Sequence, residues 1–259
     1  MPDTVLALSA RGLKKSYGAL EVTKDVSFDV PEHSALGIIG PNGAGKTTLF
    51  NLITGTQRPN AGQISLFGQD ITRSDARRRC HMGIARSFQV PQPFSGLTAY
   101  ENTLIAAAFG QRISETAART PAAEALERSG LGPKANVLAG QLTLLDRKRL
   151  ELARALATAP RLLLLDEIAG GLTEAECHEL IDLIRDIRAA GTTIVWIEHV
   201  LHALLSVVDE VMVLDFGEMI AKGEPARIMK DPRVAAIYLG PGEDTGEDAG
   251  VQGRETAHG

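Results

Sequence analysis

The 259-residue chain has little of what marks a membrane-spanning, disulfide-bonded or nucleic-acid-binding protein. Its two cysteines, Cys80 and Cys177, lie far apart and outside any CxxC or Cys/His cluster, so we expect no disulfide or metal site from them and infer a reducing cytoplasm. No apolar run approaches the ~20 residues that span a bilayer, and the first residues lack the pattern of a signal peptide. The net charge of −5 gives non-specific nucleic-acid binding no bulk electrostatic support. Any role at a membrane is therefore expected to come through a partner.

Short apolar runs alternate with helix-like stretches along the chain, which holds 44 % hydrophobic and 23 % charged residues. The runs at 34–40, 162–166 and 192–199 predict buried parallel strands, whereas the alternation of apolar and polar residues at 26–30 predicts a half-buried antiparallel strand. Residues 89–158 are rich in Ala, Leu, Arg and Glu at helical spacing. The pattern is typical of an α/β protein with a helical lobe.

Local signals predict further element boundaries. Thr173 and Glu176 form the capping-box pattern of a helix that ends near Gly191. The side chains that this helix is expected to bury are Cys177, Leu180, Ile184 and Ile187. A hairpin is predicted to turn at Phe216 and Gly217. The Gly-rich, acidic tail predicts disorder.

The segment GPNGAGKT, residues 40–47, matches G-x-x-x-x-G-K-[ST] and lies between a predicted strand and a predicted helix, as the phosphate-binding loop requires. Its glycines let the backbone bend and present N–H groups to phosphate oxygens at a helix N-terminus. We expect Lys46 to reach the β- and γ-phosphates and Thr47 to ligate Mg²⁺. The predicted nucleotide-binding residues here are Gly40, Pro41, Asn42, Gly43, Ala44, Gly45, Lys46, Thr47 and Thr48.

Two further strand ends carry polar residues suited to phosphoryl transfer. Asp166 ends the run LLLLD, where a carboxylate meets the magnesium shell, and Glu167 can align and deprotonate the attacking water. His199 ends another buried run, and at the same sheet edge it can donate to the γ-phosphate and hold Glu167 in place. Each residue alone also has a purely structural reading, but the phosphate loop favours the catalytic one. The other histidines have no such setting and are expected at the surface: His33, His81, His178, His202 and His258.

The order of these motifs resembles that of the ATP-binding cassette ATPases over nearly the whole chain. Tyr17, in KSYGALEVTKDVSF, falls where that family places an aromatic ring against adenine. Gln89, in ARSFQVPQ, falls where its glutamine links the core to the helical lobe and contacts magnesium or water. The resemblance implies ATP and Mg²⁺ as cofactors. It also implies catalytic roles for Lys46, Gln89, Glu167 and His199, and metal ligation by Thr47, Gln89 and Asp166.

The same resemblance implies the fold and its division. It predicts an α/β P-loop NTPase with a RecA-like core, an antiparallel β-subdomain and a helical subdomain. Residues 1–88 and 159–238 are expected to form the core with the β-subdomain, residues 89–158 the helical (signature) subdomain, and residues 239–259 a disordered tail.

The family's signature, LSGGQ, has a degenerate counterpart here. Counting back 23 residues from Asp166, the separation usual in the family, gives Thr143, so LTLLD occupies the signature slot and LAGQ, residues 138–141, is a near-miss before it. Thr143 keeps a hydroxyl for a γ-phosphate oxygen, whereas Leu144 and Leu145 replace two glycines. Asp146 introduces a negative charge near a polyphosphate, which the following Arg147 and Lys148 are expected to offset in part. We therefore expect LTLLD to contribute only weakly to the binding and hydrolysis of ATP held at a partner's phosphate loop.

Two smaller departures follow the catalytic carboxylates. Ile168 stands where the family commonly has proline, and Thr173 stands where it usually has the aspartate that communicates between paired ATP sites. Both departures bear on communication between the two ATP sites rather than on ATP binding.

A finer likeness is to the ATPase subunits of branched-chain amino-acid importers, carried by ARSFQVPQPFSGLTAYENTL, RLELARAL, IVWIEHVLHAL and DFGEMIAKGEPARIMKDPRVAAIYLG. It implies a cytoplasmic subunit on the inner face of the cell membrane. The implied partners are membrane permease subunits, a homologous second ATPase or a second copy of the chain, and, indirectly, an external solute-binding protein.

Other readings remain open. Importers of urea and short-chain amides use closely similar subunits. The segment LTLLD raises a further reading, in which this chain is a non-hydrolysing regulatory or structural partner, although Glu167 and His199 argue against it. A soluble cassette ATPase on ribosomes or DNA is disfavoured, because the chain has one cassette and no long coiled coil, and Arg77–Arg79 is more typical of a solvated face. We expect no nucleic-acid partner.

Overall fold

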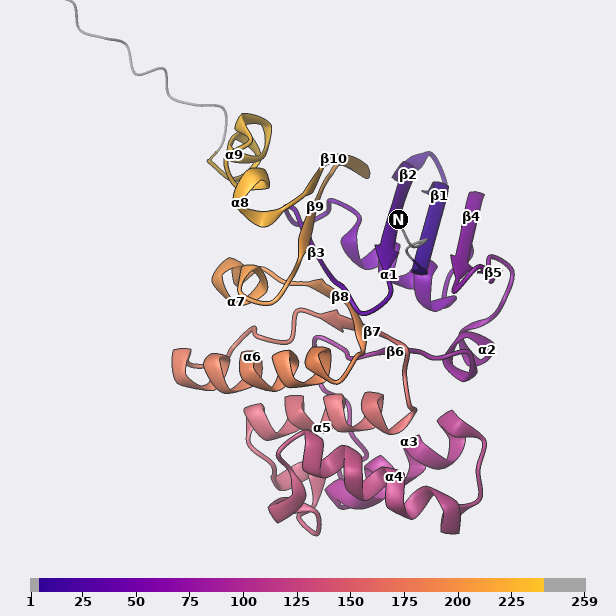
Figure 1. Ribbon diagram of the computed structural model, residues 1–259, viewed down its shortest axis with the longest axis vertical. Helices are drawn as coiled ribbons and strands as arrows, with labels where there is room; N and C mark the ends of the chain where they lie inside the picture. Colours follow the sequence, from indigo (N-terminus) through magenta and orange to yellow (C-terminus); the bar gives the residue numbers. More distant parts are fainter. Residues whose placement is uncertain (1–4, 240–259) are drawn as a thin grey trace, which may run out of the picture.

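Parallel strands form the sheet on which the phosphate loop is built (Figure 1). The computed structural model describes residues 5–239. Within this range the larger sheet has the order β10-β9-β3-β8-β7-β6. Its strands are β3 (Ala35–Ile39), β6 (Ile84–Arg86), β7 (Leu162–Asp166), β8 (Thr193–Ile197), β9 (Glu210–Asp215) and β10 (Glu218–Gly223). All neighbours pair in parallel except β9 and β10. The predicted parallel strands are confirmed, and every residue of β3, β7 and β8 is buried because both faces of the sheet are covered.

A smaller antiparallel sheet packs over one side of the phosphate-loop helix. Its order is β2-β1-β4-β5, with bounds β1 (Leu6–Tyr17), β2 (Leu20–Pro31), β4 (Ala61–Leu66) and β5 (Gln69–Asp70). Buried and partly buried positions alternate along the second half of β2, as the alternating sequence predicts. Helix α1 (Lys46–Thr54) buries Leu49, Phe50, Leu52 and Ile53 in a cluster shared by both sheets. This packing fixes the helix whose N-terminus follows the phosphate loop.

Three helices form the region farthest from the antiparallel sheet (Figure 1). They are α3 (Ala99–Gln111), α4 (Glu115–Arg128) and α5 (Leu144–Ala157), with short 3₁₀ turns at Gly132–Lys134 and Ala139–Gln141 between α4 and α5. The predicted helical lobe is therefore present, but residues 89–98 precede its first helix as turns and irregular chain. Helix α5 contributes Leu152 and Leu156 to the core of the larger sheet, so it joins the two regions.

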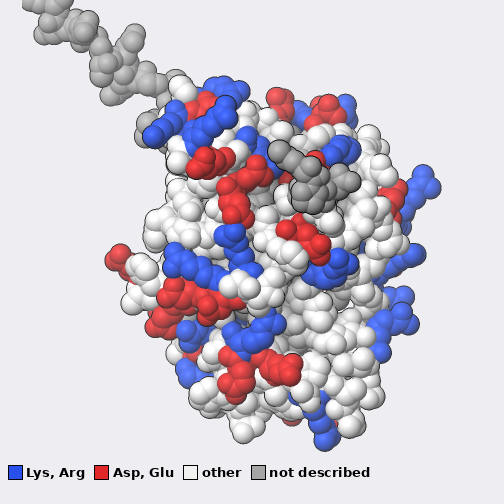
Figure 2. Space-filling view, in the orientation of Figure 1, with Lys and Arg blue, Asp and Glu red and all other residues white. Residues whose placement is uncertain are grey.

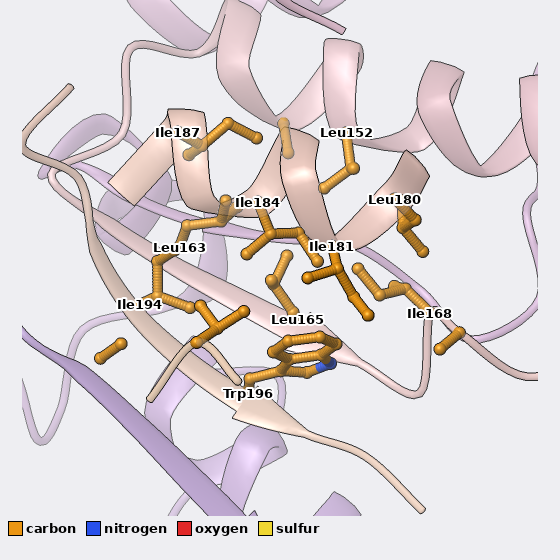
Figure 3. Packing of buried hydrophobic residues seen from close by; sticks show 14 of the residues in the cluster. Leu152, Leu163, Leu165, Ile168, Leu180, Ile181, Ile184, Ile187, Ile194 and Trp196 are labelled. Atoms are coloured by element: carbon orange, nitrogen blue, oxygen red, sulfur yellow. The ribbon is translucent and has the colours of Figure 1, made fainter. Parts of the chain in front are cut away.

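The remaining helices lie beside the larger sheet or follow its last strand in the chain. They are α2 (Ala76–His81), α6 (Glu174–Ala189), α7 (Leu201–Leu205), α8 (Pro225–Ile228) and α9 (Pro232–Leu239). Figure 3 shows α6 packing Leu180, Ile181, Ile184 and Ile187 against strand residues that include Leu163, Leu165 and Trp196. In residues 5–239 the structure contains no helix with the length and apolar character needed to cross a membrane.

Local predictions from the sequence agree with the structure except at one strand end. The α6 capping box is present, and the hairpin turns at Phe216 and Gly217, both with positive φ. The strand predicted to run through 199 instead ends at Ile197, because the Glu198 carboxylate accepts hydrogen bonds from backbone N–H groups of the following loop. The tail predicted to be disordered, residues 239–259, begins one residue too early, since Leu239 ends α9; the rest of it lies outside the described residues.

The α6 capping box gives a first prediction. Thr173→Ala removes the hydroxyl that accepts the Glu176 N–H at 3.3 Å, and we expect it to lower the free energy of unfolding by about 1 kcal/mol in urea denaturation. Thr173→Ser keeps the hydroxyl and should cost much less. Equal losses for the two variants would contradict this role.

Candidate active site

The phosphate loop follows β3 in a conformation that its glycines alone allow. Gly40, Gly43 and Gly45 all have positive φ, at 151°, 82° and 98°. A Cβ on Gly40 would lie 2.0 Å from the Leu214 carbonyl oxygen, and one on Gly45 would lie 2.5 Å from that of Val22, so neighbouring backbone excludes any larger residue. Gly43 has open space around it, and its backbone is accessible at the point where the loop turns into α1.

Lys46 begins α1 and is buried inside the loop. Its Nζ donates to the carbonyl oxygens of Gly40 at 2.7 Å and Pro41 at 2.9 Å. Burial lowers the pKa of Lys46 below its usual value, while the charges of Glu167 and Asp166 oppose that shift. The predicted loop residues are therefore assembled with both carboxylates nearby, whereas Thr47 is exposed beside them.

Asp166 ends β7 and is held by a cation that the sequence did not single out. Arg86, at the end of the adjacent β6, forms an ion pair with the Asp166 carboxylate. The same guanidinium donates to Asn51 Oδ1 of α1 at 2.7 Å. Arg86 therefore ties the metal-site candidate to the phosphate-loop helix, and its signal was a basic residue ending the apolar segment three residues before Gln89.

The Glu167 side chain contacts two other predicted site residues, Gln89 and His199, which come from distant segments. Its Oε2 accepts from Gln89 Nε2 at 2.5 Å, and its Oε1 lies 2.8 Å from His199 Nε2. Glu167 adopts φ 47°, a left-handed conformation that is uncommon for a side-chain-bearing residue and is enriched at functional sites. The structure thus places an amide and an imidazole within hydrogen-bond reach of one carboxylate at the sheet edge.

Tyr17 makes contacts outside this cluster. Its hydroxyl hydrogen-bonds the Gln57 side chain, and Lys15 Nζ lies 5.2 Å from its ring centroid. Tyr17 is 45 % exposed. Its predicted contact with adenine stays a prediction.

The signature slot forms the start of helix α5. Thr143 is the N-cap residue, and its hydroxyl accepts the Asp146 N–H at 3.2 Å while donating to Asp146 Oδ2 at 2.8 Å. Leu144 is exposed and Leu145 is buried. The Thr143 hydroxyl, predicted to face a γ-phosphate, is thus bonded within its own helix turn.

The expectation for the charge of Asp146 is wrong. Arg147 donates to the Gly140 carbonyl and Lys148 is buried beside Glu198, so neither offsets it. The partner is Lys134, whose Nζ lies 2.5 Å from Asp146 Oδ2. Burial alone would raise the pKa of Asp146, but hydrogen bonds from Lys134 and Thr143 outweigh burial and hold that pKa below its usual value. Lys134 lies in the earlier of the two 3₁₀ turns before α5, Gly132–Lys134, at a sequence separation of 12 residues from Asp146.

The near-miss LAGQ serves a local purpose. Its last three residues form a 3₁₀ turn, and the Gly140 N–H donates to the Ser95 carbonyl at 3.1 Å. The two other departures are structural as well: Ile168 is buried in the core, and Thr173 caps α6. A further buried carboxylate that the sequence did not single out, Glu198, accepts the Ala169 N–H at 2.9 Å.

A glycine loop at a helix N-terminus, a buried aspartate and a glutamate held by Gln89 and His199 define a P-loop nucleotide hydrolase. Comparison with known proteins gives the family. The family model described as ABC transporter matches residues 23–170. The branched-chain amino acid transport ATP-binding protein LivG of Salmonella typhimurium is 36 % identical over 248 residues, with 90 % of this chain and 97 % of LivG covered. The chain therefore belongs to the ABC transporter family and is one of its ATP-binding cassette ATPases.

Two other similarities agree with that assignment. The lipopolysaccharide export system ATP-binding protein LptB of Haemophilus influenzae is 33 % identical over 233 residues, covering 90 % of this chain and 97 % of LptB. The solved ADP conformation of MJ1267, an ATP-binding cassette of an ABC transporter, matches with a TM-score of 0.84 at 30 % identity, covering 92 % of this chain and all of that one. The expected fold class and ATPase family are confirmed.

The Arg86–Asp166 pair gives a second prediction. Both side chains are less than a tenth exposed, so Arg86→Met leaves a buried carboxylate unpaired and should lower the free energy of unfolding by about 3–5 kcal/mol. In an Asp166→Asn background the same substitution should cost much less. A double-mutant cycle in urea measures the difference, and equal costs in the two backgrounds would contradict the pairing.

Proposed function

We propose that this ATPase couples ATP hydrolysis to the uptake of amino acids, in the first place branched-chain ones, through separate permease subunits at the inner face of the cell membrane. The observation that carries hydrolysis is the Gln89–Glu167–His199 arrangement. The solute class is supported by the 36 % identity to LivG over nearly its full length. Urea or short-chain amides stay the alternative solutes.

In the proposed mechanism the phosphate loop binds the ATP phosphates. Backbone N–H groups of the loop and Lys46 neutralise the charge on the β- and γ-phosphates, and the exposed Tyr17 ring stacks on adenine. Glu167 orients the attacking water and accepts its proton. His199 contacts the γ-phosphate while holding Glu167, so the water is aligned only when the phosphate is in place.

The donor set at this edge fits Mg²⁺. Thr47 offers a hydroxyl, Asp166 a carboxylate and Gln89 an amide, which are the oxygen ligands that Mg²⁺ prefers. When bound, Mg²⁺ would neutralise charge on the β- and γ-oxygens. Lys46, the residue before Thr47, has its pKa lowered by burial, and it lies close enough to Asp166 for that carboxylate to oppose the shift.

A groove beside Gln89 supports docking of a permease helix. A cavity of about 290 Å³ lies between the sheet and the helical region, lined by residues that include Phe88, Ala106, Glu151 and Arg154. Phe88, Val90 two residues along the chain, and Phe109, which lines an adjoining cavity, are more than half exposed, which is typical of a protein-binding surface. Because Phe88 and Val90 flank Gln89, a helix seated there would move with the residue that contacts Glu167.

Nucleic acid is a poorer candidate partner. On the face shown in Figure 2, acidic and basic side chains are interspersed on the left, and separate basic groups project from the right edge. On the part of that face formed by residues 5–239 and not covered by the grey atoms, basic side chains do not form the continuous surface that nucleic acid needs.

For the dimer we propose a head-to-tail pair with a homologous ATPase whose signature is intact. This chain's phosphate loop then faces the intact signature, and LTLLD faces the partner's ATP. The Asp146–Lys134 pair and the two leucines support the proposal that LTLLD contributes only weakly to hydrolysis of the partner's ATP.

A third prediction tests the catalytic carboxylate. In the complex with its membrane subunits, Glu167→Gln should lower phosphate release from ATP by at least about 100-fold, because the amide cannot accept the proton from water. ATP binding should persist. Glu174→Gln, an exposed carboxylate in the first turn of α6, is the matched control and should leave turnover unchanged. Turnover within twofold for Glu167→Gln would refute its assignment as the base.

A fourth prediction tests the signature slot. The combined change Leu144→Gly, Leu145→Gly and Asp146→Gln, made in the Glu167→Gln chain, isolates hydrolysis at the partner's phosphate loop. Residual turnover should rise several-fold, since glycines permit close backbone approach and the negative charge is removed.

Leu138→Ser, in the near-miss segment, is the control for that variant and should leave the residual turnover unchanged. Unchanged turnover in the restored signature, with the helical region still folded by circular dichroism, would show that LTLLD does not limit the second site.

A further inference from the structure

Glu198 is a buried carboxylate that the mechanism above does not use. It follows β8, and 2 % of it is exposed. Among residues 5–239 no cation forms an ion pair with it. The charge of Glu198 acts on Lys148 of α5, which is itself buried. Burial lowers the pKa of Lys148, and the negative charge of Glu198 opposes that shift. A carboxylate in such a position is costly unless backbone donors satisfy it.

Three backbone N–H groups satisfy the carboxylate, and they come from two loops. Oε2 accepts from Ala169 N at 2.9 Å, in the loop after β7. Oε1 accepts from His199 N at 2.9 Å and Val200 N at 3.3 Å, in the loop after β8. One side chain therefore bridges the two loops.

These loops carry the residues that meet at the catalytic edge. Glu167 lies two residues before Ala169, and its N–H donates to the Ile197 carbonyl at 2.8 Å. The left-handed Glu167 is therefore flanked by two ties to the same segment, one through Ile197 and one through Glu198. Loss of the second tie would release the loop on one side of Glu167 and the loop of His199 together.

We propose that Glu198 is a positioning residue for ATP hydrolysis, which keeps Glu167 and His199 in contact by accepting hydrogen bonds from both of their loops. The inference rests on the proposed role of Glu167 as the base. A carboxylate is required because each of its two oxygens accepts from a different loop. An amide has one oxygen, so its NH₂ group would face a backbone N–H of one loop.

The test compares steady-state ATP hydrolysis by the full complex carrying Glu198→Gln or Glu198→Asp. We expect Glu198→Gln to lower kcat about 10- to 100-fold, as misplacement of a reacting group does, with the KM for Mg-ATP changed less than about threefold. Glu198→Asp keeps the charge but is one methylene shorter, so it should lose kcat as well. If Glu198→Gln fails to fold, the Asp variant serves the same comparison.

A matched control separates positioning from general destabilisation. Ile187→Val removes a methyl group from the core cluster that packs against the same sheet, and it should lower the melting temperature without lowering kcat. In a Glu167→Gln background, Glu198→Gln should add less than a twofold loss, because it acts through Glu167.

Two outcomes would overturn the inference: kcat within twofold of the parent in both Glu198 variants, or an equal loss in the parent and Glu167→Gln backgrounds. Full turnover by Glu167→Gln alone would instead overturn the proposed function.

Discussion

The parallel register of β3, β7 and β8 is the constraint on which the active site depends. Ile38 of β3 and Asp166 of β7 both pair with Ile197 of β8, so the three strands end at the same level. The phosphate loop, the Asp166–Glu167 pair and the Glu198–His199 segment therefore leave one sheet edge together. Every residue of these strands is buried, so a slip by one residue would move each side chain to the opposite face and into contact with different neighbours.

Three charged side chains at that edge are buried, and each is satisfied locally. Asp166 is paired with Arg86, Lys46 donates to carbonyl oxygens of its own loop, and Glu198 accepts from three backbone N–H groups. Buried charges contribute little to stability when paired, but losing one partner is costly. These groups therefore restrict the geometry of the edge more than they strengthen the fold, which agrees with a site that must align a water molecule.

The signature slot follows a different logic. In LTLLD the helix N-terminus, a natural anion site, has its first turn occupied by the carboxylate of Asp146, which also takes the Thr143 hydroxyl and Lys134. The segment provides a capped start for α5, and it exposes the Leu144 side chain where the family has glycine. Asymmetry between the two ATP sites of a dimer would then arise from an ordinary helix-capping interaction.

Much of the architecture could be predicted because it depends on local patterns. Apolar runs defined the buried strands, the glycine spacing defined the phosphate loop, and Thr173 with Glu176 marked the start of α6. The proposed catalytic roles of Glu167 and His199 followed from their places at the ends of predicted strands, whereas that of Gln89 came from the family resemblance. Tyr17 keeps only a predicted role, because its contacts lie outside the cluster.

What the pattern of residues could not supply was the partner of each charge. No motif singled out Arg86, Lys134 or Glu198, and each acquires its role from a neighbour brought close by packing or by a tight turn. Arg147 and Lys148 lie next to Asp146 in sequence, yet the helix directs them elsewhere, because adjacent residues on a helix face different sides. Composition and periodicity determined the strands, the helices and the motifs, whereas the pairing of buried charges was decided by the folded chain, since it depends on side-chain direction and distance in space.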